Sequence, residues 1–202
     1  MNNKVWINGN DGPNSYNGWT SPKDYITEVP DFPVKGVNFK DISPLLANRK
    51  VFRDVIYEMG RLVGIEPTEP PYFTRYPDYW IGIDARGFIF ASALSYEFGG
   101  GVVMCRKADK LPPTVFSHSY STEYSEDTIQ MKQGSGTAVV VDDVLATGGT
   151  LQAANYLAGT AGYDVIDNLV LIDLLYVTRV ITSMGDGVRE FDLEVKSLIQ
   201  YE

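Results

Sequence analysis

Residues 139–150 of this chain read Val139-Val140-Val141-Asp142-Asp143-Val144-Leu145-Ala146-Thr147-Gly148-Gly149-Thr150. The apolar, β-branched run at the start of this stretch predicts a central parallel strand that is covered on both faces. The two glycines allow the backbone to turn sharply and to approach a ligand closely. The threonine hydroxyl groups, together with the unpaired N–H groups of a helix that begins here, suit a phosphate dianion. The stretch therefore predicts a strand, a phosphate-binding turn and a helix.

Two adjacent acids, Asp142 and Asp143, stand between the predicted strand and the predicted turn. Ionised carboxylates only accept hydrogen bonds, so they suit a diol or a magnesium ion. A phosphate and a diol held side by side describe a ribose 5-phosphate. The alternative is a plain strand-to-helix turn with a capping Asp, which explains the glycines but not two successive acids. The turn lacks both the lysine of a Walker A loop and the Gly-x-Gly-x-x-Gly spacing of dinucleotide-binding proteins.

The rest of the chain alternates between strand-like and helix-like segments, which predicts an α/β fold with a mostly parallel sheet flanked by helices. In such folds ligands bind at the carboxyl ends of the strands. Helices are predicted at residues 50–63, 87–98 and 149–162, and strands at 79–83, 101–105, 137–141, 165–173 and 194–200.

Three segments lack clear periodicity. Residues 1–20 predict an N-terminal extension, and the Pro-rich residues 64–78 predict an inserted surface loop. The polar residues 107–133 predict a long mobile loop, in which the single histidine, His118, is expected to face solvent without a role.

Composition narrows the class of protein. The length of 202 residues suits one α/β domain, and the net charge of −9 argues against nucleic acid or an anionic membrane as the main partner. The single Cys105, expected in the core, cannot form an intramolecular disulfide, which fits a reducing compartment. Because neither a signal sequence nor an apolar run of membrane-spanning length is evident, a cytoplasmic protein without a membrane partner is expected.

A second turn follows the predicted strand at 79–83. Ala85 and Gly87 permit a tight turn whose N–H groups face an anion, and Arg86 adds a forked, permanently charged donor. The alternative is a local ion pair between Asp84 and Arg86.

A third strand end carries a group of cations. Arg106, Lys107 and Lys110 fall within six residues of a chain that has only 17 basic side chains. They predict a clamp for pyrophosphate, and the alternative is a solvated run of charges.

These motifs resemble those of adenine phosphoribosyltransferases, a family of type I phosphoribosyltransferases that use phosphoribosyl pyrophosphate (PRPP). The resemblance also rests on residues 30–46 (PDFPVKGVNFKDISPLL), 120–124 (YSTEY) and 197–202 (SLIQYE), and it extends from about Val29 to the C-terminus. The chain departs from the family in its N-terminal extension, in the 64–78 insertion, and at Asn38 and Lys40, where an apolar residue and an Arg are more frequent.

The resemblance implies a type I phosphoribosyltransferase domain at 21–202, with a small hood at 21–46 that binds the base and a flexible active-site loop at 107–133. It assigns catalytic roles to Glu123 and Arg86, although Glu123 without the family match would be an ordinary surface Glu. The resemblance also implies that the ribose is bound by Asp142 and Asp143, and the 5-phosphate by Ala146, Thr147, Gly148, Gly149 and Thr150. It implies that the pyrophosphate is bound by Ala85, Arg86, Arg106, Lys107 and Lys110. The base would contact Val37, Phe39, Lys40 and Leu174.

The implied reaction is the displacement of pyrophosphate from ribose C1 by adenine, which gives AMP. Magnesium would be bound mainly through PRPP, without dedicated protein ligands, and the chain would form a homodimer. Two alternatives remain: the same reaction with hypoxanthine, guanine or a pyridine, and a non-catalytic regulator that senses PRPP. The regulator is disfavoured because this chain is acidic and carries no added DNA-binding module.

Overall fold

The computed structural model of the chain describes residues 21–65, 76–121, 126–174 and 193–201. Its main sheet consists of β3 (Tyr79–Ile83), β4 (Gly101–Lys107), β5 (Phe116–Ser121), β6 (Glu126–Met131), β7 (Gly136–Leu145), β8 (Tyr163–Asp173) and β9 (Lys196–Gln200).

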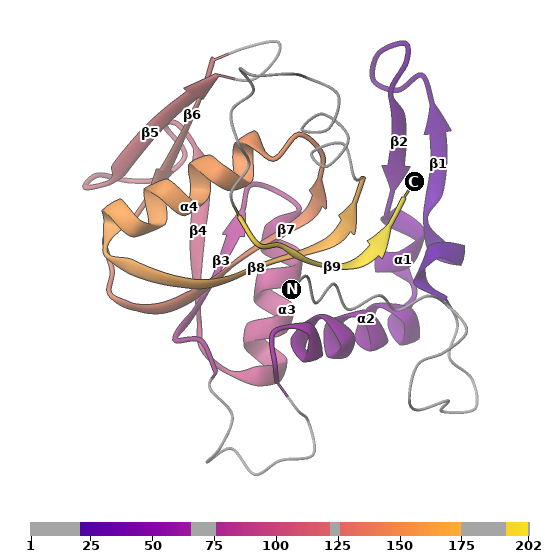
Figure 1. The fold of residues 1–202 in the computed structure, drawn as a ribbon, viewed down its shortest axis with the longest axis horizontal. Helices are drawn as coiled ribbons and strands as arrows, with labels where there is room; N and C mark the ends of the chain where they lie inside the picture. The colour runs from indigo at the N-terminus through magenta and orange to yellow at the C-terminus, as the bar shows by residue number, and fades with distance from the viewer. Residues whose placement is uncertain (1–20, 66–75, 122–125, 175–192, 202) are drawn as a thin grey trace.

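The order of strands across this seven-stranded sheet is β5-β6-β4-β3-β7-β8-β9 (Figure 1). Five neighbouring strands of this order run parallel, namely β4, β3, β7, β8 and β9. Strand β6 pairs antiparallel with β4 and with β5. The mostly parallel sheet predicted from the alternating sequence pattern is therefore confirmed.

Helices cover both faces of the sheet. The described helical segments are the short 3-10 turn η1 (Pro22–Tyr25), α1 (Ser43–Ala47), α2 (Arg49–Leu62), α3 (Gly87–Phe98) and α4 (Gly149–Ala161). Helices α2 and α3 pack on one face and α4 on the other (Figure 1). None of the helices in the described ranges is long and apolar enough to cross a bilayer.

Strand β7 takes part in both hydrophobic cores. Val139 and Val141 are buried with residues of α2 and α3, whereas Val140 is buried with residues of α4. Successive side chains of a strand point to opposite faces, so a β-branched run covered on both sides is the pattern expected of a central strand.

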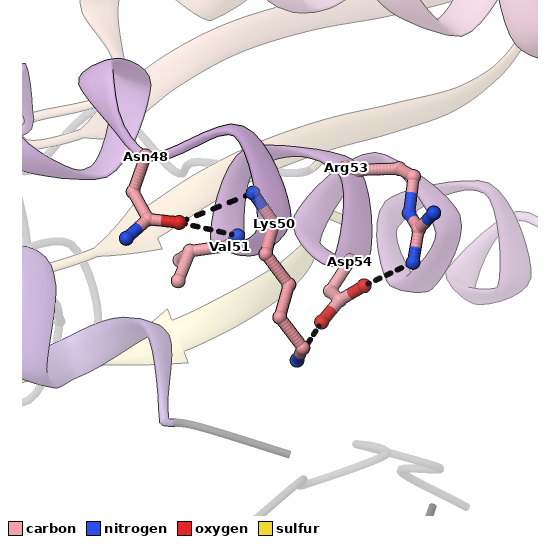
Figure 2. Close-up of polar contacts among 5 residues, drawn as sticks. All are labelled: Asn48, Lys50, Val51, Arg53 and Asp54. Atoms are coloured by element: carbon pink, nitrogen blue, oxygen red, sulfur yellow. Dashed lines mark hydrogen bonds and ion pairs between the residues drawn. The ribbon is translucent and has the colours of Figure 1, made fainter. Parts of the chain in front are cut away.

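The start of α2 is fixed by a side-chain cap. Figure 2 shows Asn48 Oδ1 accepting hydrogen bonds from the backbone N–H groups of Lys50 and Val51, each at 3.1 Å. One turn further on, Asp54 pairs with Lys50 at 2.8 Å and with Arg53 at 3.6 Å. Because the cap satisfies two N–H groups that have no partner within the helix, it defines where α2 begins.

A separate hairpin forms the N-terminal part of the described chain. Strands β1 (Thr27–Pro30) and β2 (Asn38–Asp41) pair antiparallel, with Glu28 opposite Lys40 and Val29 opposite Phe39. This two-stranded sheet lies beside the C-terminal end of the chain (Figure 1).

The prediction of a long mobile loop at 107–133 did not include the two strands that this segment contains. Strands β5 and β6 form a hairpin that joins the main sheet through β6 and packs on α4. The sequence did not reveal this hairpin because Ser, Thr and charged residues dominate it, and of its described side chains only Ile129 and Met131 are fully buried. His118 is half-buried in β5 and its ring lies 4.4 Å from that of Tyr156, so the expectation that it faces solvent is wrong.

Two other predicted segments lie wholly or mostly outside the described residues. They are the extension at 1–20 and most of the insertion at 64–78.

Candidate active site

The candidate site lies at the carboxyl ends of β3, β4 and β7. These strands are adjacent and parallel, so the residues that follow them come together at one edge of the sheet. The helix after β3 packs on one face and the helix after β7 on the other, so the sheet has its topological switch point between β3 and β7. Ligands of open α/β sheets bind at this place.

The two acids at the end of β7 are held close together by the backbone. Asp143 is 2% exposed and Asp142 is half-buried, and the Asp143 N–H donates to Asp142 Oδ1 at 2.9 Å. Burial raises the pKa of both carboxyl groups, and the charge of Asp143 raises the pKa of Asp142 further. Hydroxyl groups of a bound diol would supply the hydrogen bonds that stabilise the ionised forms.

Among the described residues, Arg86 is the cation that forms an ion pair with one of these acids. Its Nε is 3.0 Å from Asp143 Oδ2, and its charge lowers the pKa of Asp143 against the effect of burial. The contact is an ion pair without hydrogen-bond geometry, so Asp143 Oδ2 has no hydrogen-bond partner among the described residues. The guanidinium carbon also lies 5.5 Å from the centre of the Phe39 ring. Arg86 thus connects the end of β7 with the β1–β2 hairpin.

The turn that carries Arg86 needs a glycine at the next position. A Cβ at Gly87 would lie 2.6 Å from the Val141 carbonyl oxygen and 3.2 Å from Asp142 Oδ1. The turn after β3 can therefore approach the acids of β7 only because residue 87 lacks a side chain.

Asp84 and Arg106 form a second ion pair at the site, so the alternative of a local Asp84–Arg86 pair is wrong. Arg106 Nε lies 3.2 Å from Asp84 Oδ2, and Arg106 Nη1 donates to the Lys110 carbonyl at 3.0 Å. The second bond folds residues 107–110 back toward the end of β4. Lys107 and Lys110 are exposed there, beside a site that also contains Arg86.

The turn at 146–150 has the geometry predicted for it. Gly148 has φ +80°, a conformation that glycine adopts readily, and α4 begins at Gly149. The Gln152 N–H donates to the Gly148 carbonyl, so the N–H groups just before Gln152 lie at the open end of the helix. A Cβ at Gly149 would meet no atom within 4 Å, so open space adjoins the turn.

Tyr120 was not identified from the sequence. Its hydroxyl group donates to Thr150 Oγ1 at 3.1 Å, which joins the β5–β6 hairpin to the turn at 146–150. Burial raises the pKa of Tyr120, and the hydrogen bond to Thr150 partly opposes this rise. Tyr120 is one of the 13 tyrosines of the chain, and it lies in a polar stretch, so its side chain was not singled out from the sequence.

The residues assigned to the base occupy two places. Phe39, half-buried beside Arg86, and the exposed Val37 belong to the β1–β2 hairpin and its turn. Leu174 follows β8, and its N–H donates to the Leu145 carbonyl at the end of β7. The Lys40 side chain is directed elsewhere, since its ammonium group lies 2.8 Å from Glu28.

The catalytic candidate Glu123 lies outside the described residues, between β5 and β6 in the sequence. Cys105 is buried in the core as predicted, and burial raises the pKa of its thiol to about 12.

This chain is similar in sequence and in fold to known proteins. The Phosphoribosyl transferase domain family matches residues 72–175. An adenine phosphoribosyltransferase from Bdellovibrio bacteriovorus is 39% identical over 179 residues, which cover 89% of this chain and 98% of that protein. The crystal structure of adenine phosphoribosyltransferase from Thermoanaerobacter pseudethanolicus has a TM-score of 0.73 at 32% identity, covering 89% of this chain and 98% of that one. The APRTase of Giardia lamblia complexed with 9-deazaadenine has a TM-score of 0.71 at 29% identity, covering 90% of this chain and 96% of that one.

Proposed function

This chain belongs to the adenine phosphoribosyltransferase family, and we propose that it transfers the 5-phosphoribosyl group of PRPP to adenine, which yields AMP and pyrophosphate. The observation that carries the proposal is the arrangement at the end of β7. There the paired carboxyl groups of Asp142 and Asp143 directly precede the open helix end at 146–150, and Arg86 lies against the pair.

We infer one orientation for PRPP at these groups. The 5-phosphate would accept hydrogen bonds from the backbone N–H groups of Ala146 to Thr150 and from the two threonine hydroxyl groups. The ribose 2- and 3-hydroxyl groups would donate to Asp142 and Asp143. The pyrophosphate would then lie toward the turn of Ala85 and Arg86 and toward the cations Arg106, Lys107 and Lys110.

Magnesium is the metal ion we propose for the reaction. Carboxylate oxygens such as those of Asp142 and Asp143 are of the kind that Mg²⁺ prefers, so the chemistry of the site fits the ion. No protein ligand is assigned to it, because Asp143 Oδ2 already lies 3.0 Å from Arg86 Nε. Most of its ligands would be phosphate oxygens of PRPP and water. A bound magnesium ion would neutralise charge on the departing pyrophosphate, and Arg86 and Arg106 would add fixed positive charge beside it.

The chemistry at ribose C1 needs positioning and charge stabilisation more than a nucleophile on the enzyme. Displacement by a purine nitrogen proceeds with inversion through an oxocarbenium-like transition state. The site would hold the two reactants in line, and Glu123 would handle the proton of the purine.

We favour adenine as the base because the Asn38 and Lys40 side chains of β2 are directed to Glu28, away from Phe39. Asn38 Nδ2 donates to Glu28 Oε2 at 2.6 Å, and Lys40 Nζ lies 2.8 Å from the same oxygen. Both side chains that differ from the common family pattern are therefore bound to Glu28, whereas Phe39 lies beside Arg86. Backbone groups of this segment would read the amino edge of adenine, with Phe39 and Leu174 on the two faces of the ring.

A homodimer is supported by an apolar surface formed by α3 and β4. Ile89, Tyr96, Val102 and Met104 are exposed, and Tyr96 retains 92% of its accessible surface. Val103 and Cys105 point to the α4 side, so Val102 and Met104 lie on the α3 face of β4. Exposed apolar surface of this kind suits a protein interface. A second copy bound there would approach the pyrophosphate side of the site, because α3 begins next to Arg86 and β4 contains Arg106.

The cytoplasm is the compartment we propose for the reaction. The single cysteine of the chain, Cys105, is a buried free thiol, which suits a reducing environment.

The proposal is tested by measuring pyrophosphate release from PRPP with adenine, hypoxanthine, guanine and nicotinate as substrates. We expect adenine to be preferred strongly, by about 10⁴-fold in kcat/KM in the best case, since a site built to pair with an amino group leaves a buried polar group unpaired against an oxo group. Values for adenine and hypoxanthine within roughly tenfold of each other would favour the broader purine reaction. PRPP binding without turnover of any base would favour the regulator.

A further inference from the structure

The ring of Tyr201, the last described residue of the chain, lies close to two lysines of the N-terminal region. Lys40 Nζ is 4.0 Å from the centre of the Tyr201 ring, and Lys23 Nζ is 4.8 Å from it. The Lys40 side chain is 7% exposed, and its ammonium group also forms the 2.8 Å ion pair with Glu28, its neighbour across the hairpin. A cation that is removed from water in this way interacts more strongly with a ring face than an exposed one does.

Tyr201 is also fixed to the body of the protein. Its backbone N–H donates to the Asp173 carbonyl at 3.0 Å, and its side chain packs against the core formed with α2 and α3. Asp173 is the last residue of β8 and directly precedes Leu174. The Leu174 N–H in turn donates to the Leu145 carbonyl.

These contacts link the two proposed walls of the base site. Lys40 is the neighbour of Phe39 in β2, and Asp173 is the neighbour of Leu174. Tyr201 contacts both neighbours, one through its ring and the other through its backbone. The β1–β2 hairpin belongs to a separate two-stranded sheet, so it shares no strand pairing with the main sheet among the described residues. Its position depends on the buried residues Ile26 and Ile42 at its two ends and on side-chain contacts such as these.

We propose that Lys40 and Tyr201 are positioning residues for the base: their contact holds Phe39 at a fixed separation from Leu174. This inference rests on the proposed function for the identity of the base, but the coupling of the hairpin to the C-terminus does not. The Lys40 side chain then acts on the base through Phe39, and the backbone of β2 remains available to contact the base.

The kinetic test uses the full chain and four variants. Tyr201→Leu and Lys40→Met remove the contact while keeping apolar volume, whereas Tyr201→Phe and Lys40→Arg retain the ring face and the cation. We expect the first two to raise the KM for adenine about tenfold, the effect of losing one desolvated cation–π contact. The KM for PRPP should stay within about twofold, and the two conservative variants should resemble the wild type.

Lys196→Met is the matched control. Lys196 forms an ion pair of 2.6 Å with Asp167, so this variant makes the same chemical change at a site on β9 and β8. It should leave both Michaelis constants unchanged. Equal rises in the KM for adenine and for PRPP, or an adenine effect of Lys196→Met as large as that of Lys40→Met, would show a general loss of structure and overturn the inference.

Hydrogen exchange provides a readout that does not depend on activity. Tyr201→Leu and Lys40→Met should speed amide exchange in residues 27–41 and leave β3 and β7 unchanged. Unchanged exchange in the hairpin would overturn the coupling even in an active enzyme. Faster exchange there in a chain that forms no AMP would support the coupling and count against the proposed function instead.

Discussion

Arg86 and Asp143 contact each other across two strand ends, with Arg86 Nε 3.0 Å from Asp143 Oδ2, although the two residues are far apart in the sequence. They are assigned to different parts of PRPP, Arg86 to the pyrophosphate and Asp143 to the ribose. When PRPP binds, the ribose hydroxyl groups would take the place of Arg86 at Asp143, and the guanidinium group would turn to the pyrophosphate. The exposed fraction of the Arg86 side chain, 44%, leaves it room for this exchange.

The double variant Asp142→Asn with Asp143→Asn should bind PRPP poorly. Each substitution keeps the shape of the side chain but removes a charge-assisted hydrogen bond to a ribose hydroxyl group. Each such bond contributes roughly 1.5–3 kcal/mol, so we expect the KM for PRPP to rise at least about a hundredfold. Steady-state kinetics measure this, and circular dichroism checks that the fold is retained. Near-normal PRPP kinetics would exclude the diol role.

The single variant Asp142→Asn should be more stable than the wild type at neutral pH. Burial and the charge of Asp143 raise the pKa of Asp142 well above its usual range. As pH rises, Asp142 in the unfolded chain ionises first, so the free energy of unfolding falls until the folded group ionises too. Asparagine does not ionise, so the variant should have the higher melting temperature at neutral pH and lose that advantage in acid. A lower melting temperature at neutral pH would contradict the burial effect.

Arg86→Gln should weaken PRPP binding and make it more sensitive to acid. Loss of one charge-assisted contact corresponds to a rise of roughly 10–100-fold in the KM for PRPP. Because Arg86 lowers the pKa of Asp143, the variant should protonate Asp143 at a higher pH. Its KM for PRPP should therefore begin to rise at a higher pH than that of the wild type as pH falls.

Arg53→Gln is the control for this variant, since Arg53 lies on α2 in an exposed pair with Asp54. It should leave the pH profile of the wild type unchanged. Parallel profiles for Arg86→Gln and the wild type would mean that Arg86 does not tune Asp143.

Glu123→Gln should reduce turnover more than it reduces PRPP binding. A group that handles a proton in the transition state contributes roughly 10²–10⁴-fold to kcat, whereas PRPP contacts other residues. Single-turnover kinetics and PRPP titration separate the two effects. Glu194→Gln, an exposed Glu near β9, is the control and should have no effect. Equal losses in kcat and PRPP affinity would argue against a role in proton transfer.

Met104→Glu should dissociate the proposed homodimer. The charge would be buried at an apolar interface without a partner, which is strongly unfavourable. Light scattering should give about twice the chain mass of 22.4 kDa for the wild type and the single mass for the variant. Val34→Glu, at an exposed apolar residue in the turn of the β1–β2 hairpin, should remain dimeric. A wild type that is monomeric at high concentration would refute the interface.

Local sequence patterns predicted those parts of the fold in which burial or backbone conformation restricts the residue type at each position. The β-branched run at 139–141 and the glycines at 148 and 149 predicted the strand, turn and helix, because burial on two faces and the turn conformation restrict residue types directly. The hairpin of β5 and β6 was missed because its pairing with β4 compensates for a polar composition. Propensity does not report such tertiary pairing.

The contacts within the site could be predicted only in part. Residue types indicated acids and cations at strand ends, and the adjacency of β3 and β7 brings them together. The pairing of Arg86 with Asp143, and of Asp84 with Arg106, depends on the direction in which each side chain points. The same holds for Lys40, which contacts Glu28 and Tyr201 and has no local signal for either.

The shared position of β7 between the two hydrophobic cores affects how the enzyme would lose activity on heating. Val139 and Val141 belong to one core and Val140 to the other, and Asp142 and Asp143 follow them directly. Melting of either core would therefore displace the acids, so ribose binding should disappear in the same cooperative transition as the fold. The β1–β2 hairpin contributes no strand to that sheet and can open at a lower temperature. Warming should thus weaken binding of the base before that of the sugar phosphate.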